Sequence, residues 1–136
     1  MEAARALLPL GLLLAAIPAL AQDKPVVDPP LGPTPNLEQA MMLRCSAAFA
    51  LVSGDQARGD KLALGYPPLG QRGREFFVRA SAQLMDEMHV SYDQVEAMLR
   101  EQVAELQQGS TAAKDRAAYV DAVMQPCLEE LVANGF

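Results

Sequence analysis

Tryptophan is absent from this sequence, and histidine and cysteine are scarce: it holds one histidine, His89, and two cysteines, Cys45 and Cys127. One histidine leaves little room for a Ser-His-Asp or Cys-His arrangement, and no nucleophile elbow or phosphate-binding glycine loop accompanies it. The two cysteines cannot form a C-x-x-C motif or a covalent haem attachment, and they are too few for a zinc finger. We therefore expect a non-catalytic protein without a cofactor; an enzyme of unknown type is the third alternative.

Long apolar runs are also missing, apart from residues 6–20 near the N-terminus. That run is shorter than the roughly 20 apolar residues that a membrane-spanning helix needs, and proline and glycine interrupt it. It follows Arg5 and ends at the small residues Ala19 and Ala21, which is the pattern of a secretory signal peptide. We predict a signal peptide over residues 1–21, cleaved near Ala21, and a periplasmic or secreted protein without a membrane span.

Positive charge is in short supply, with 11 lysines and arginines against 17 aspartates and glutamates and a net charge of −6. Cleavage after residue 21 removes one charge of each sign, Glu2 and Arg5, and leaves this difference unchanged. An acidic protein is a poor partner for nucleic acid or for an anionic membrane. We expect the partner to be a protein or a small apolar ligand, and the oligomeric state stays open.

Two regions follow the signal peptide. Residues 22–35 hold five prolines and no helical periodicity, so they predict a disordered, extended, Pro-rich arm. Residues 36–136 show helical patterns without strand-like alternation or internal repeats. The expected fold is an all-α bundle of four main helices.

The first helix is predicted to begin after Asn36, whose side chain caps it together with Gln39, and to end at Gly54. Its inward stripe is Leu37, Met41, Cys45, Ala48, Phe49 and Val52. A glycine-rich connection over residues 53–71 follows, with a short helical turn over residues 60–63.

The second helix is predicted over residues 72–89, with Phe77, Leu84 and Met88 facing the core. Phe76 falls toward the polar side, where it either packs under the preceding connection or is exposed. The polar side is formed by Arg72, Glu75, Arg79, Gln83, Asp86 and Glu87.

The third helix is predicted to begin after Ser91, which forms a capping box with Gln94, and to end in the segment QQGST. Its stripe is Val95, Leu99, Val103 and Leu106. The fourth helix is predicted to begin near Thr111, to kink or restart at Pro126, and to end at Gly135. Its inward residues are Ala112 or Ala113, Tyr119 or Val120, Val123, Cys127 and Leu131.

Cys45 and Cys127 both fall on the inward stripes of the terminal helices. In an oxidising compartment, two such cysteines form one disulfide. Its geometry needs Cα atoms within about 7 Å, so the first and last helices must be neighbours.

Met85, Met88 and His89 share one side of the second helix, and two thioethers with an imidazole suit Cu(I). The alternative, which we favour, places Met88 in the core and lets His89 cap the end of the helix.

Six methionines follow the signal peptide, and flexible thioethers suit surfaces that accept many apolar partners. They are Met41, Met42, Met85, Met88, Met98 and Met124. The outline resembles that of small, disulfide-linked, helical acid-stress chaperones of the periplasm, without a matching run of residues. We favour the interpretation that the methionines fill the core, and we expect a binding or envelope-stress protein; copper handling is the alternative.

Overall fold

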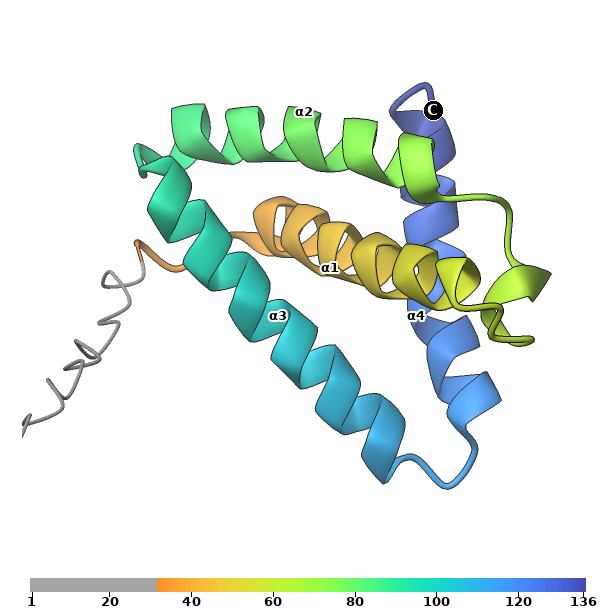
Figure 1. Ribbon diagram of the computed structural model, residues 1–136. Helices are drawn as coiled ribbons and strands as arrows, with labels where there is room; N and C mark the ends of the chain where they lie inside the picture. Colours follow the sequence, from red (N-terminus) through yellow and green to blue (C-terminus); the bar gives the residue numbers. More distant parts are fainter. Residues whose placement is uncertain (1–31) are drawn as a thin grey trace, which may run out of the picture.

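The structure is a computed structural model that describes residues 32–136 (Figure 1). The predicted signal peptide over residues 1–21 lies outside the described residues, as does the predicted arm over 22–35 apart from its last four residues. The elements in chain order are α1 (Leu37–Ala57), the 3-10 helix η1 (Ala63–Gly65), α2 (Gly70–Met88), α3 (Tyr92–Ala112) and α4 (Arg116–Ala133). The all-α fold with four main helices is confirmed for this part of the chain.

The central helix is α1, which packs against all three others. In Figure 1, α2, α3 and α4 outline a triangle with α1 inside it. Small buried residues on α1, such as Ala47 and Ala48, let its neighbours approach closely. On α2, a Cβ added at Gly73 would lie 3.0 Å from the Cβ of Phe49. The two backbones therefore come so close at Gly73 that a larger residue would press against α1.

Two helices begin with the capping boxes that the sequence predicts. The Gln39 amide donates to Asn36 at 2.9 Å, and the Gln94 amide donates to Ser91 at 3.3 Å. Each glutamine side chain accepts from the amide of its cap residue in return. Leu37 was expected in the core, and this prediction is wrong: its side chain is 85% exposed, and the first buried residue of α1 is Gln39.

The predicted end of α1 at Gly54 is wrong, because the helix continues for another turn. Gly59 ends it: this residue adopts a positive φ of 77°, which glycine reaches without steric strain. The next amide, of Asp60, donates back to the carbonyl of Asp55 at 3.0 Å. This pattern is a Schellman C-cap, which satisfies carbonyls that the end of a helix leaves unpaired.

The buried aromatic residue of α2 is Phe76, and the prediction for Phe77 was wrong. Phe76 is 3% exposed, and its ring packs edge-on against Phe49 at 5.2 Å and Phe136 at 6.2 Å between centroids. Phe77 is half-buried. The face of α2 turned to α1 includes Gly73, which carries no side chain and so adds nothing to the hydrophobic pattern.

The boundary between α3 and α4 also differs from the prediction. The helix α3 runs through the segment QQGST, where the Thr111 hydroxyl donates to the carbonyl of Gln107 at 2.8 Å. The helix α4 begins at Arg116 instead of Thr111. Its cap is Asp115, whose carboxylate accepts from the amide of Ala118 at 3.0 Å.

The last helix passes through Pro126 without a break, so the predicted restart does not occur. Pro126 removes the hydrogen bond to the carbonyl of Ala122, and because both residues are exposed, water can replace it. Gly135, with a φ of 81°, follows the end of α4, and the Phe136 amide donates to the carbonyl of Leu131 at 3.1 Å. The predicted stop at Gly135 is therefore confirmed.

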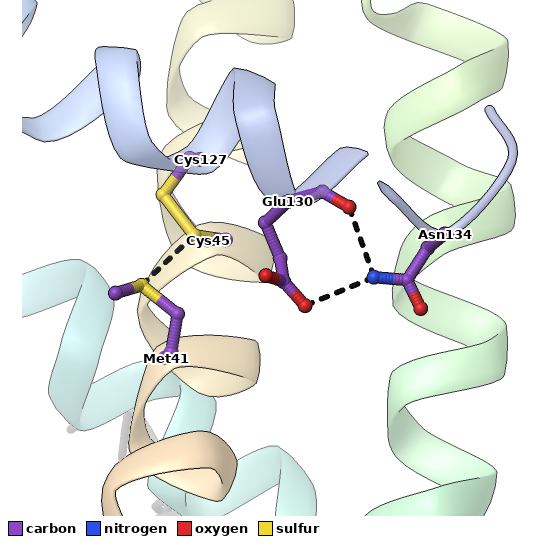
Figure 2. Close-up of a disulfide and its surroundings, with 5 residues drawn as sticks. All are labelled: Met41, Cys45, Cys127, Glu130 and Asn134. Carbon is purple, nitrogen blue, oxygen red and sulfur yellow. Dashed lines mark hydrogen bonds between the residues drawn. A yellow bond between two sulfur atoms is a disulfide. The ribbon is translucent and has the colours of Figure 1, made fainter. Parts of the chain in front are cut away.

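A disulfide joins Cys45 on α1 to Cys127 on α4, as the sequence predicts (Figure 2). The two Cα atoms are 5.2 Å apart, and both residues are fully buried. The sulfur of Met41 lies 3.6 Å from that of Cys45, a packing contact because a disulfide sulfur carries no proton. Nearby, the Asn134 side-chain amide donates to the carbonyl and the carboxylate of Glu130, both at 2.9 Å, which secures the end of α4.

The packing of α2 predicts different costs for its two adjacent phenylalanines. Phe76→Ala should lower the free energy of unfolding by about 3–5 kcal/mol, because it leaves a cavity between Phe49 and Phe136. Phe77→Ala should cost less than half as much, since its ring is only half-buried. Urea unfolding of both variants measures the difference. The opposite ranking would mean that α2 turns its other face to α1.

Candidate functional site

A cleft of about 350 Å³ opens between the C-terminal halves of α1 and α3 and the N-terminal half of α4. Its floor consists of buried apolar side chains from all three helices: Ala48, Val52, Leu106, Val123 and Met124. Its walls hold the half-buried Leu51 and Val120, and its polar lining consists of Asp55, Arg58, Gln107, Ser110, Thr111, Arg116 and Tyr119. The lining is thus half polar and half apolar, which suits a small molecule with both an apolar and a polar part.

Two further hollows involve α2. One, of about 290 Å³, lies between α1 and α2 and includes Arg74 and Phe77. The other, of about 420 Å³, lies along α2 beside Phe136. The charged side chains that line each of them come from α2 alone. The cleft instead gathers charges from α1 and α4, so we treat it as the candidate site.

Gln56, in the last turn of α1, shapes the connection that borders the cleft. Its side-chain nitrogen donates to the carbonyls of Ala63 at 3.1 Å, Tyr66 at 3.2 Å and Pro67 at 2.9 Å. Its side-chain oxygen accepts from the amide of Leu69 at 3.1 Å. One amide side chain thus organises a segment of backbone that has little regular structure of its own.

Asp60 fixes the start of the short helix in that connection. The helical turn predicted over residues 60–63 is observed slightly later, as η1, and Asp60 accepts from the amide of Ala63 at 3.0 Å. This hydrogen bond, together with the charge of Arg116, lowers the pKa of Asp60. Because folding lowers this pKa, the contacts stabilise the fold above the unfolded-state pKa, and their contribution is lost as pH falls through the folded-state value.

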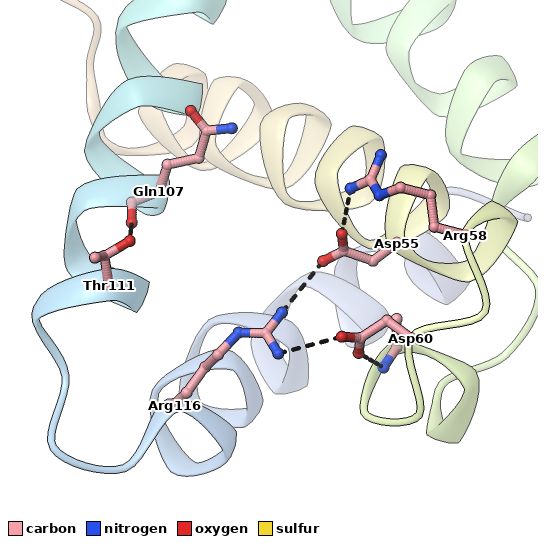
Figure 3. Close-up of polar contacts among 7 residues, drawn as sticks. Asp55, Arg58, Asp60, Gln107, Thr111 and Arg116 are labelled. Atoms are coloured by element: carbon pink, nitrogen blue, oxygen red, sulfur yellow. Dashed lines mark hydrogen bonds and ion pairs between the residues drawn. The ribbon is translucent and has the colours of Figure 1, made fainter.

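Four charged side chains meet at the edge of the cleft (Figure 3). Arg58 and Arg116 both pair with the carboxylate of Asp55, and the Arg116 contact is 3.4 Å long. Arg116 also reaches Asp60 at 3.4 Å. The first turn of α4 is thereby linked to the end of α1 and to the connection that follows it.

Tyr119 closes one side of the cleft by lying against the backbone of α3. A Cβ added at Gly109 would be 2.1 Å from the Tyr119 hydroxyl oxygen and 2.5 Å from the ring carbon that bears it. Only a residue without a side chain allows the ring this position. We expected Gly109 to help break the third helix. It lies within α3 instead, and the Tyr119 ring of α4 packs against it.

The three residues considered for copper lie in different environments. Met88 is buried in the core, and Met85 is half-buried against it. The helix α2 ends at Met88, and His89 is exposed with a left-handed backbone at φ 54° and ψ 44°. The helical spacing that would place His89 beside Met85 therefore stops one residue too early. Copper binding itself remains a prediction. Within residues 32–136, no three His, Cys, Asp or Glu side chains form a group that could hold a metal ion.

The six methionines belong to the core, as we favoured from the sequence. Four of them, Met42, Met88, Met98 and Met124, are buried. Met41 and Met85 are half-buried and pack against the same cluster. The flexible thioethers fill the spaces between helices rich in alanine, and Met124 forms part of the floor of the cleft.

The charged residues of the cleft were not among the sequence-based candidates. Asp55 and Arg58 fall in the segment predicted as a connection. Their spacing of three residues was therefore not recognised as that of an ion pair on a helix. Arg116 is 61 positions from Asp55. Nothing in the local pattern signals that contact, because it depends on how α4 packs against α1.

Comparison of the chain with protein-family models, with curated proteins and with solved structures finds no match. Among the helices of residues 32–136, none combines the length and apolar character that crossing a bilayer requires.

The contact between Tyr119 and Gly109 can be tested by a double-mutant cycle. Glycine to alanine inside a helix ordinarily stabilises by about 1 kcal/mol. We expect Gly109→Ala to give no such gain, because the new methyl group displaces the Tyr119 ring, and we expect the gain to return in a Tyr119→Ala background. Urea unfolding of the four proteins should show a coupling above about 0.5 kcal/mol. The same effect of Gly109→Ala in both backgrounds would contradict this packing.

Proposed function

We propose that this protein is a non-catalytic, exported binding protein that holds a small, largely apolar ligand in the cleft between α1, α3 and α4. The observation that carries the proposal is a hollow of about 350 Å³ with a buried apolar floor and a polar lining. This volume is at the lower end of the roughly 300–1,000 Å³ typical of ligand pockets. A ligand with a single short apolar chain would suit it.

Export is supported by two features. The buried disulfide between Cys45 and Cys127 is of the kind that persists in extracytoplasmic compartments. The composition of residues 1–21 is that of a cleavable signal peptide. Together they favour the periplasm or the extracellular space as the place where the ligand is met.

Binding of a small ligand has more support than binding of unfolded clients. A chaperone surface needs a broad exposed apolar patch. Within residues 32–136, the large exposed apolar residues are distributed one to each element: Leu37, Leu64, Val78, Tyr92 and Val132. The methionines, which could have formed an adaptable surface, are in or against the core.

The test is binding of N-phenyl-1-naphthylamine, a neutral apolar dye whose fluorescence rises in apolar sites. We expect saturable binding by the full chain and a loss of at least about tenfold in affinity for Val120→Trp, which fills the cleft. Val132→Trp is the matched control, because Val132 is also on α4 but is 68% exposed and outside the cleft. No saturable binding, or equal binding by the two variants, would contradict the proposal.

The copper alternative is tested separately. Titration with Cu(I) of the full chain and of a His89→Ala variant would show whether Met85, Met88 and His89 bind the ion. Tight binding of one ion that needs His89, in a protein that does not bind the dye, would replace ligand binding by copper handling.

A further inference from the structure

The charges at the cleft are not balanced within its lining. Two guanidinium groups, of Arg58 and Arg116, line it, against one carboxylate, that of Asp55. Both guanidinium groups point to that carboxylate (Figure 3). Asp60, the second carboxylate near Arg116, is outside the lining. With Asp60 included, the two guanidinium groups and two carboxylates balance, and within the lining itself the guanidinium groups are in excess.

The contacts of Arg116 are long for a charged pair. Its nitrogens are 3.4 Å from Asp55 and 3.4 Å from Asp60, whereas close charge-assisted hydrogen bonds measure about 2.7–2.9 Å. A guanidinium group has five N–H donors in a planar fork, and loose pairs leave much of that capacity unused. Arg116 is thus able to donate to another anion.

Both carboxylates keep another partner if Arg116 turns toward a ligand. Asp55 stays paired with Arg58, and Asp60 still accepts from the amide of Ala63. Both carboxylates therefore still have a hydrogen-bond donor after Arg116 has moved. The free-energy cost of replacing a protein carboxylate on Arg116 by a ligand anion is therefore small.

We propose that the ligand of the cleft is an anionic amphiphile with one apolar chain, whose carboxylate is bound by Arg116 with support from Arg58. The chain would lie on the floor formed by Val52, Val123 and Met124, while the anionic group replaces Asp55 or Asp60 on Arg116. This inference rests on the proposed function, because it requires that the cleft accept a ligand. A trimethylammonium head group has no acceptor atom and would gain no hydrogen bond from either guanidinium group.

The test compares three amphiphiles with the same chain: dodecanoate, 1-dodecanol and dodecyltrimethylammonium. Each amphiphile is titrated, below its own critical micelle concentration and at pH 8, against the full chain with bound N-phenyl-1-naphthylamine, and displacement of the dye is measured. We expect dodecanoate to bind about tenfold or more tighter than dodecanol, since a hydrogen bond to a charged group contributes at least that factor. Dodecyltrimethylammonium should bind more weakly than both.

Variants identify the residue responsible. Arg116→Gln should reduce dodecanoate affinity to that of dodecanol and leave dodecanol affinity unchanged, and Asp55→Asn should raise dodecanoate affinity because it removes a competing carboxylate. Arg100→Gln is the matched control: Arg100 pairs with Glu96 on α3 at 3.1 Å, outside the cleft. Circular dichroism checks that each variant is folded.

The outcomes separate this inference from the proposed function. If dodecanol binds as tightly as dodecanoate, or if Arg116→Gln changes both equally, the anionic head group is wrong while ligand binding stands. If the dye binds and none of the amphiphiles displaces it, the inference fails while ligand binding stands; if the dye does not bind either, both proposals fail. Binding to phosphatidylglycerol vesicles without binding of monomeric dodecanoate would also overturn the inference, since it would make a membrane surface the source of the anion.

Discussion

The disulfide between Cys45 and Cys127 is the constraint on which the position of α4, and with it the cleft, depends. It links the middle of the central helix to the second half of the last helix, 82 positions along the chain. In the chain-entropy model, closing a loop of that length stabilises a fold by about 4.5 kcal/mol, a large fraction of the total stability of a small domain. Five of the 22 buried apolar residues among residues 32–136 are alanine, which buries little area, so the core gains less from apolar burial than a core of larger side chains would.

The cleft is a consequence of how α4 is attached. Its C-terminal half is bound to α1 at Cys127, and a short connection joins its first residue, Arg116, to α3. Between these two points, α4 borders a hollow with Val123 and Met124 at the bottom. Arg116 at the free end pairs loosely with Asp55 on α1, and Tyr119 lies against α3. The same residues that position α4 therefore supply the chemistry of the candidate site.

Local signals in the sequence predicted most of the fold. Both capping boxes, the number of helices and the buried positions of the cysteines follow from short-range patterns. Several of the errors involve glycine. Gly54 looked like a helix stop, but Gly59 has the positive φ that ends α1. Gly73 and Gly109 admit close contacts from other helices, which a pattern of apolar side chains cannot reveal. The candidate site could not be predicted from local patterns either, because Arg116 and Asp55 are 61 positions apart and meet only through the packing of α4 against α1.

Amide hydrogen exchange on the Cys45→Ala/Cys127→Ala double variant tests most directly whether the disulfide positions α4. Alanine removes the link without placing a polar group in the core. We predict that amides of α4 (Arg116–Ala133) lose most of their protection, while those in α1, α2 and α3 lose clearly less. Unchanged protection of α4, or an equal loss in all four helices, would contradict the view that this one bond holds the last helix, and the cleft beside it, in place.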